Sequence, residues 1–385
     1  MIQILKGKVS LYIIPLLLCI MYVLESYYKV VFFYSGKTTD LLQITKGIVF
    51  VGFLAYILKR QAKTLWLTSI LFLTFAIGQW ALPSIMLKPA LIAFIKLIFP
   101  LILLIFFSVF ELSNKQKVVF FKVFEYIIVF NSVLILVGFL FNVKVFNTYI
   151  GSRFGYNGFF LTSATGSYVY SIVLIYLLAR YKHTVFKKPT NLIIILSIIL
   201  IGTKVLYIFL TSFFFVYLWC YSKINRNVLI GSTLGLGLLG LYVFFYKYGI
   251  FNEIRQRDGL LSSLMSFRND LLLEQTIPFI KGNWNVINYL FGGVSDLSTK
   301  SQIEFFDIFY FFGILGGILY FYIFFKTFLV FKTEIQISVL LVVLFILILL
   351  AGNFFSYTSV AIYIVVLREY FKKSDLSVTK NNGMI

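Results

Sequence analysis

Long apolar segments follow one another along almost the whole chain of 385 residues, with only short polar connectors between most of them. Hydrophobic residues make up 61% of the sequence and charged residues 12%, and the mean hydropathy is +0.96. A soluble domain cannot cover its surface with so few charges. We therefore predict an all-α, polytopic integral membrane protein that forms a single domain over residues 1–385.

A bilayer core of about 30 Å requires roughly 20 apolar residues per helix, and we expect about twelve such helices. The first segment reads as an uncleaved span, because its apolar core is too long for a signal peptide and no small-x-small cleavage site follows. Two long apolar stretches divide at the Gly-containing turns "IGTK" (201–204) and "AGNFFS" (351–356). The predicted spans are residues 9–28, 41–58, 65–87, 90–110, 118–142, 165–181, 190–202, 203–221, 227–246, 304–325, 333–351 and 353–370.

The distribution of charge predicts the orientation of the chain. If the N-terminus is cytoplasmic, 20 of the 34 basic residues lie in cytoplasmic segments, in agreement with the positive-inside bias. We therefore expect a multi-pass protein with both termini in the cytoplasm. The same bias accounts for the formal net charge of +20, so we expect no nucleic-acid partner.

Two predicted external segments are longer than simple turns, residues 142–167 and 247–303, and long loops of this kind often carry function. The second contains "RDGLLSSLMSFRND" (257–270), with Arg257 and Arg268, and Arg255 lies just ahead of it. Arginine pairs with phosphate oxygens through two parallel hydrogen bonds, so these residues could clamp a pyrophosphate. An amphipathic helix that binds anionic membrane lipids explains the same composition equally well.

The pattern after Gly259 predicts a short helix. Ser262, Ser263 or Ser266 can cap its N-terminus, "FRNDLLLEQTI" can continue it, and Pro278 should end it soon afterwards. Gly259 itself argues against one unbroken helix over the whole stretch.

Three further basic residues lie near or inside apolar segments. Arg153, in "GSRFGYNGFF" (151–160), has aromatic neighbours that suit a sugar face, a lipid headgroup or the aromatic belt of any membrane protein. Lys204 follows the "IGTK" turn and can snorkel to the interface. Lys96 lies deeper, just before Pro100, where an ionisable group is a site candidate unless it snorkels as well.

Several chemistries are disfavoured. The only cysteines, Cys19 and Cys220, lie inside apolar runs and imply neither a disulfide framework nor a thiolate metal site. The only histidine, His183, lies in a basic loop predicted to be cytoplasmic, so His-based triads and His-ligated metals are not expected outside. Walker A and Rossmann glycine patterns are missing, so we do not expect ATP-driven transport by this chain alone.

Motifs in the second half of the chain resemble the O-antigen polymerases of the Wzy type and the related O-antigen ligases. These motifs are the mid-chain "IGTK", "SFRNDLLLEQTIPFIKGNWNVINYLFGGVSD" (266–296) and "KSQIEFFDIFYFFGILGGILYF" (300–321). In that superfamily a basic residue follows a Gly-containing turn, an Arg starts an external helix, and two glycine motifs follow. The matching positions here are Lys204, Arg268, Gly292 with Gly293, and Gly313 with Gly316.

The resemblance implies a helical bundle of the type-C glycosyltransferase kind in the bacterial inner membrane. Such a protein uses lipid-linked sugar donors on its external side and needs no nucleotide, metal or other cofactor. Its partners would be undecaprenyl-pyrophosphate-linked glycans, membrane lipids and a chain-length regulator protein. The ligases have a His just ahead of the Gly-x-x-Gly span, where this chain has Ser301, Gln302, Ile303 and Glu304, with Asp307 after them, so the polymerase branch is favoured.

The function implied is polymerisation of undecaprenyl-pyrophosphate-linked repeat units into O-antigen or capsular polysaccharide. Arg268 is expected to stabilise the charge of the departing pyrophosphate. Glu304 is the first candidate to act on the acceptor hydroxyl and Asp307 the second. The residues expected to assist in pyrophosphate binding are all basic: Arg255, Arg257, Arg153 and Lys204.

Two other functions stay open. A flippase for lipid-linked oligosaccharides has a similar number of spans, but it needs charged residues around a central cavity and does not need a long external loop. Few charges lie within the predicted spans, which favours the polymerase. An O-antigen ligase would keep the fold and change the acceptor.

Overall fold

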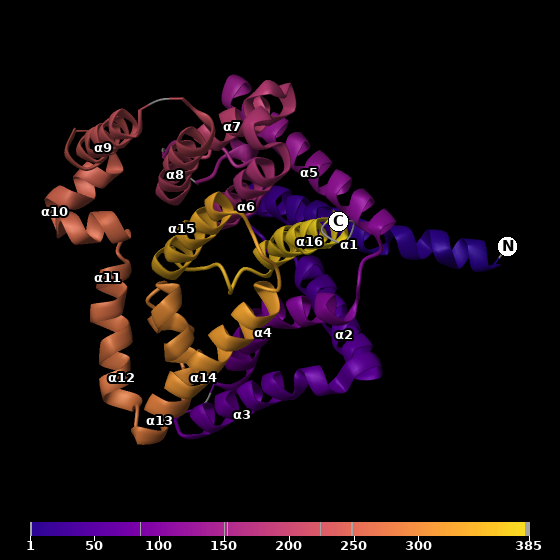
Figure 1. The fold of residues 1–385 in the computed structure, drawn as a ribbon. Helices are drawn as coiled ribbons and strands as arrows, with labels where there is room; N and C mark the ends of the chain where they lie inside the picture. The colour runs from indigo at the N-terminus through magenta and orange to yellow at the C-terminus, as the bar shows by residue number, and fades with distance from the viewer. Residues whose placement is uncertain are drawn as a thin grey trace.

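The computed structural model describes residues 2–84, 86–149, 151, 153–223, 225–247 and 249–381. Over these residues the chain forms helices and no β-strand, which confirms the all-α prediction (Figure 1). The α-helices are α1 (Ile2–Ser35), α2 (Leu41–Gln61), α3 (Trp66–Trp80), α4 (Leu87–Val109), α5 (Asn114–Phe141), α6 (Ser163–Tyr181), α7 (Pro189–Leu200), α8 (Lys204–Tyr221), α9 (Arg226–Tyr242), α10 (Ile250–Met265), α11 (Arg268–Leu271), α12 (Ile277–Asn283), α13 (Val286–Phe291), α14 (Glu304–Phe328), α15 (Ile335–Ala351) and α16 (Thr358–Asn381). Shorter 3-10 or π turns are η1 (Ala62–Leu65), η2 (Lys144–Phe146), η3 (Lys182–Lys187), η4 (Val243–Lys247), η5 (Leu272–Thr276) and η6 (Leu297–Thr299).

Among the described residues, seven helices are long and apolar enough to cross a membrane, or up to eight if a bent pair is one span. The bent pair consists of α6 with η3 and α7, which turn by 104° at Lys188. At about 1.5 Å per residue, the 12 residues of α7 are too short to cross a bilayer by themselves. A helix lies over each of the twelve predicted spans. The fold is therefore that of a multi-pass membrane protein, while the number of crossings stays a prediction.

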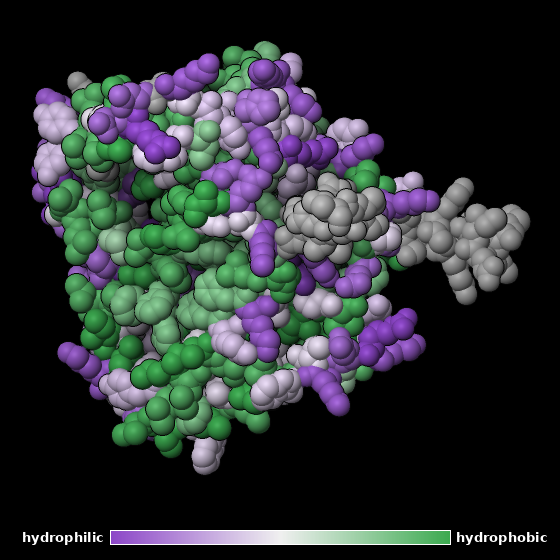
Figure 2. All heavy atoms as spheres, viewed as in Figure 1, coloured by the Kyte–Doolittle hydropathy of each residue, from purple (hydrophilic) through white to green (hydrophobic). Residues whose placement is uncertain are grey.

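Large apolar side chains cover much of the outer surface. Trp80, Tyr34, Phe141 and Ile335 are all at least three-quarters exposed. In Figure 2, hydrophobic residues cover the middle of the visible face, and hydrophilic residues gather mainly along its upper and right-hand edges. Apolar area of this extent is unfavourable in water and is suited to lipid.

Helix α6 lies at the centre of the bundle. Every residue from Thr165 to Leu178 is buried, and α8, α15 and α16 all pack against the helix. A helix that is apolar on every side needs neighbours on every side. The N-terminal end of α6 is thereby held rigidly beside the turns before α8 and α16.

Helix α14 is broken at Gly313, where the backbone takes φ 69° and ψ −174°. A Cβ added at Gly313 would lie 2.3 Å from the nitrogen of Gly292, and a Cβ added at Gly292 would lie 2.5 Å from the nitrogen of Gly313. Glycine allows both the positive φ and this close approach of two backbones. Two glycines named by the family resemblance thus pack α13 directly against the break in α14.

The segment predicted as the second external loop is itself helical, because α10 to α13 occupy most of it. Figure 1 shows α10, α11 and α12 along one edge of the molecule. The expected break occurs at Gly259, which has non-helical φ and ψ angles inside α10.

Two predictions of detail in this segment are wrong. Ser262 and Ser263 lie inside α10 and Ser266 ends it, so none of the three caps the helix that starts at Arg268. Pro278 does not end that helix, because it occupies the first turn of α12 after a π-helical turn, where its missing N–H is tolerated.

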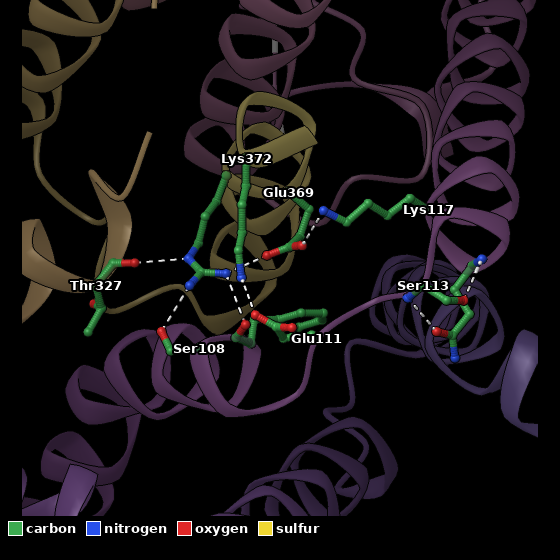
Figure 3. Close-up of polar contacts among 10 residues, drawn as sticks. Ser108, Glu111, Ser113, Lys117, Thr327, Glu369 and Lys372 are labelled. Carbon is green, nitrogen blue, oxygen red and sulfur yellow. Dashed lines mark hydrogen bonds and ion pairs between the residues drawn. The ribbon is translucent and has the colours of Figure 1, made fainter. Parts of the chain in front are cut away.

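A buried ionic network joins α16 to α4, α5 and α14 (Figure 3). The Arg368 guanidinium of α16 donates to the main-chain oxygens of Phe107 in α4 at 3.1 Å and Thr327 in α14 at 2.9 Å. Arg368 also pairs with Glu369, whose Oε2 lies 3.3 Å from Nζ of Lys117 in α5. Because all of these groups have partners, the network can hold charge inside the bundle.

Candidate functional site

The segment 142–167 is fixed to the bundle by two buried polar residues. Lys29 of α1 donates to the Asn157 side chain, and to the main-chain oxygens of Gly158 at 2.6 Å and Asn147 at 3.2 Å. Asn131 of α5 accepts a hydrogen bond from the main-chain nitrogen of Phe159 at 2.9 Å. This segment is therefore a fixed part of the bundle rather than a loose loop.

The same segment packs against the "IGTK" turn that precedes α8. A Cβ added at Gly202 would lie 2.5 Å from the carbonyl oxygen of Phe154, and the Tyr156 nitrogen donates to the Leu200 oxygen at 2.7 Å. The turn can approach so closely because position 202 has no side chain. This contact brings Arg153 and Lys204 together.

Two cations, Lys204 and Arg153, lie beside the ring of Phe251 in α10, and a third, Arg268, lies near Lys204. Lys204 Nζ lies 4.2 Å from the centre of the Phe251 ring, and Arg153 Cζ lies 5.2 Å from it and 3.7 Å from the ring of Tyr149. Arg268 and Arg153 both lie near enough to Lys204 to repel its charge. We call Arg153, Lys204 and Arg268 the cation cluster. It combines positive charges that repel one another with aromatic faces, an arrangement suited to an anion.

Arg268 has spare hydrogen-bonding capacity. Its Nη1 donates to the Met265 oxygen at 3.1 Å, while its Nε is buried and has no hydrogen-bond partner among the described residues. Burial lowers the pKa of the guanidinium, and four neighbours act in the opposite direction: Tyr168, Asp307, Tyr149 and Glu304. The structure thus brings Arg268 near Glu304 and Asp307, from separate parts of the sequence.

Glu304, the first residue of α14, accepts hydrogen bonds from the backbone of the turn before α16. The side chain is only 2% exposed, and its two oxygens accept hydrogen bonds from the main-chain nitrogens of Phe355 at 2.9 Å and Phe354 at 3.3 Å. The carboxylate therefore fixes the turn between α15 and α16, which the "AGNFFS" sequence forms.

Asp307 lies one helical turn further along. One of its carboxylate oxygens accepts two hydrogen bonds, and the other accepts none from the described residues. Oδ1 accepts hydrogen bonds from the Ser301 nitrogen and hydroxyl, both at 2.9 Å. Oδ2 is buried without a hydrogen-bond partner in the described part of the chain, and Nζ of Lys300 lies 3.9 Å from it. A free carboxylate oxygen that is held in place is what a proton acceptor requires.

A cavity of about 330 Å³ lies beside these carboxylates, between α1, α2, α4, α14 and the turn before α16. Hydroxyl groups of Thr162, Ser356, Tyr357 and others contribute to its wall. Its ionisable lining residues are Glu25, Lys46, Lys96, Lys300, Glu304 and Asp307. Glu304 and Asp307 line this cavity, and both also interact with Arg268 of the cation cluster.

Glu25 and Lys46 were not identified from the sequence as candidate site residues. For Lys96 the sequence left open whether it belongs to a site or snorkels to the interface. The available signal was their presence inside apolar spans, where an ionisable group is costly and often functional. Whether these residues meet in one cavity depends on how α1, α2 and α4 pack against one another, and the sequence of a single segment does not contain that information.

Arg255 and Arg257 have partners outside the cation cluster. Arg255 donates to the Phe245 oxygen at 2.8 Å and stacks on Tyr246, with 4.5 Å between Cζ and the ring centre. Arg257 is 75% exposed and pairs with Asp258 at 2.8 Å. Of the five predicted basic residues, the structure groups Arg153, Lys204 and Arg268.

Fold and site together describe a helical, membrane-compatible bundle with a cation cluster, two buried carboxylates near Arg268 of that cluster, and a cavity lined by charged, hydroxyl and apolar side chains. Within the described ranges, no three His, Cys, Asp or Glu side chains gather so that they could hold a metal ion. The chain matches no family model, no curated protein and no solved structure.

Proposed function

We propose that this chain polymerises lipid-linked oligosaccharide repeat units into O-antigen or capsular polysaccharide at the external face of the bacterial inner membrane. The observation that carries the proposal is the position of Arg268, which interacts electrostatically with Lys204 of the cation cluster and with the carboxylates of Asp307 and Glu304. A glycosyl transfer from a pyrophosphate requires cations at the leaving group and a carboxylate at the acceptor, and both are present here.

In the proposed reaction the donor is a growing glycan on undecaprenyl pyrophosphate. A hydroxyl oxygen of a second, lipid-linked repeat unit forms a bond to the anomeric carbon of the donor, and the bond from that carbon to the pyrophosphate oxygen breaks. The electron pair leaves with undecaprenyl pyrophosphate, next to the cation cluster. The hydroxyl proton passes to a carboxylate of the protein.

Asp307 is the better placed of the two carboxylates to accept that proton, because its Oδ2 has no hydrogen-bond partner among the described residues. Both oxygens of Glu304 are engaged by main-chain N–H groups, which suits a positioning role. Arg268 takes the leaving group, since its buried Nε is available for a phosphate oxygen.

A second candidate function, transport of lipid-linked oligosaccharides, is favoured by one observation. Charged residues of α1, α2 and α4 face the cavity, and a flippase needs such an interior. The small number of charges within the predicted spans therefore disfavours a transporter less than the sequence alone suggested. The cation cluster beside carboxylates still favours the polymerase. An O-antigen ligase would use the same chemistry with another acceptor.

The test is a reconstituted reaction. Purified protein in liposomes is supplied with lipid-linked repeat units extracted from cells that lack it. We expect chains of several repeats together with released undecaprenyl pyrophosphate, and we expect Asp307→Asn to form neither. If labelled repeat units instead cross the bilayer without being joined, the chain is a transporter and the proposal is wrong.

A further inference from the structure

One end of the cavity, formed by α1, α2 and α4, carries more positive than negative charge. Lys46 of α2, Lys96 of α4 and Glu25 of α1 all line it. Glu25 is attracted to both Lys46 and Lys29, so a single carboxylate serves two lysines, and Lys96 lies on the wall of the same cavity.

The three lysines differ in their hydrogen-bond and ion-pair partners. Lys29 donates only to neutral oxygens of the segment 142–167. Lys46 donates to the Ser359 hydroxyl at 2.9 Å, and that hydroxyl is also hydrogen-bonded to Glu25. Lys96 forms no hydrogen bond or ion pair with any described residue, and it lies near enough to Lys46 to repel it.

A cation on a cavity wall that has no partner in the protein is unfavourable unless an anion or water meets it. The cavity volume of about 330 Å³ falls at the lower end of the range of about 300–1,000 Å³ that is typical of small-ligand pockets. Its walls also offer the hydroxyls of Thr162, Ser356 and Tyr357, which can exchange hydrogen bonds with sugar hydroxyls.

We propose that this end of the cavity binds the carboxylate of an acidic sugar, with Lys96 as the principal cation and Lys46 as the second. The sugar would belong to the lipid-linked repeat unit, and in this respect alone the inference rests on the proposed function. Glu25 attracts Lys46, whose ammonium donates a hydrogen bond to the Ser359 hydroxyl.

The same positive charge could instead meet the phosphate of a membrane lipid. The hydroxyls of the wall favour a sugar, because they can exchange hydrogen bonds with several sugar hydroxyls, which a lipid phosphate does not have. The two sources are separated by measuring binding in bilayers of different charge.

The experiment measures binding of sodium D-glucuronate to the purified full chain in nanodiscs of phosphatidylcholine, with D-glucose as the neutral probe. We expect glucuronate to bind and glucose not to bind. Lys96→Gln should weaken glucuronate binding at least about tenfold, as expected for the loss of a charge-assisted hydrogen bond. Lys96→Arg should retain binding, and Lys88→Gln, an exposed lysine of the same helix, should match the unmodified protein.

Equal binding of the two sugars, or full binding by Lys96→Gln, would overturn the inference. Loss of glucuronate binding in nanodiscs that contain phosphatidylglycerol would assign the site to a lipid phosphate and would overturn it as well. The binding measurement requires no polymer formation. Glucuronate binding without polymerising activity would refute only the proposed function, and polymerising activity without glucuronate binding would refute only this inference.

Discussion

Arg257 and Arg268 are eleven residues apart, yet their surroundings differ. Arg257 is exposed and paired with Asp258, whereas Arg268 is partly buried beside Tyr168, Asp307 and Glu304. The difference follows from the break at Gly259 and the left-handed backbone at Ser266 and Phe267, which turn the chain between them. Only Arg268 can act together with the carboxylates of α14.

Replacing Arg268 should therefore remove most of the polymerising activity. We expect Arg268→Ala to lower the rate of chain formation by about 10²–10³, the usual effect of losing one preplaced donor to a developing anion. Arg268→Lys should recover only part of the rate, because an ammonium cannot form two parallel hydrogen bonds to phosphate. The rate of undecaprenyl pyrophosphate release measures both.

The matched control is Arg257→Ala, which removes the same charge from an exposed position in the same segment. It should leave the rate unchanged. A larger loss in Arg257→Ala than in Arg268→Ala would show that the cation cluster is not the anion site.

At this scale the sequence suggested some of the candidate residues and missed others for physical reasons. Arg268, Glu304 and Asp307 could be proposed because an arginine at the start of one expected helix and acidic residues at the start of another lie beside recognisable glycine motifs. Lys46 and Lys96 could not be placed, because a long lysine side chain can snorkel or face inward from the same position. Tertiary packing of α2 and α4 decides between these outcomes.

The break in α14 is the element that brings α13 against the bundle. Gly313→Ala would place a Cβ 2.3 Å from main-chain atoms of Phe291 and Gly292, at a positive φ. We expect a loss of stability of about 1–3 kcal/mol, the cost of strain at such a position. A lowered midpoint of thermal unfolding in detergent would measure it.

Gly235→Ala in α9 is the matched control for the glycine change. Nothing lies within 4 Å of a Cβ added there, and the position is inside a helix. Alanine should stabilise α9 by about 0.5–1 kcal/mol. If both alanine variants unfold at the same temperature, the contact between Gly313 and Gly292 does not determine the stability of this region.

The ionic network of Arg368, Glu369 and Lys117 should contribute strongly to the packing of α4, α5, α14 and α16. Glu369→Ala leaves two buried cations without their anion, and removal of one partner of such a pair typically costs about 3–5 kcal/mol. We expect a clear fall in the thermal unfolding midpoint.

The exposed pair of Lys182 and Glu334 serves for comparison, with 2.6 Å between Nζ and Oε1 and both side chains about half exposed. Glu334→Gln should change stability by about 0–1 kcal/mol. Similar effects of the two substitutions would contradict a structural role for the buried network.

Apolar length predicted where helices lie, because a helix in lipid must satisfy every backbone group internally. It did not predict their breaks: α6 and α7 turn by 104°, and Pro278 continues a helix that it was expected to end. A π-helical turn and a bend at Lys188 depend on contacts between helices, which periodicity along one segment does not contain.

At the scale of the whole molecule, the two segments predicted to be external converge on the bundle from separate parts of the sequence. The segment 142–167 supplies Arg153, α10 supplies Phe251, and α14 supplies the carboxylates. The hydropathy pattern and charge bias could predict a membrane bundle with one working face. The meeting of these residues required the packing of glycine-containing turns against that bundle.

The surface glycan ladder of a strain from which the chain has been deleted shows whether it joins lipid-linked repeat units. We expect long chains to disappear while material with a single repeat unit remains, because transfer of one unit does not require polymerisation. Loss of all surface glycan would show that the chain is not a polymerase and would indicate a flippase or a ligase.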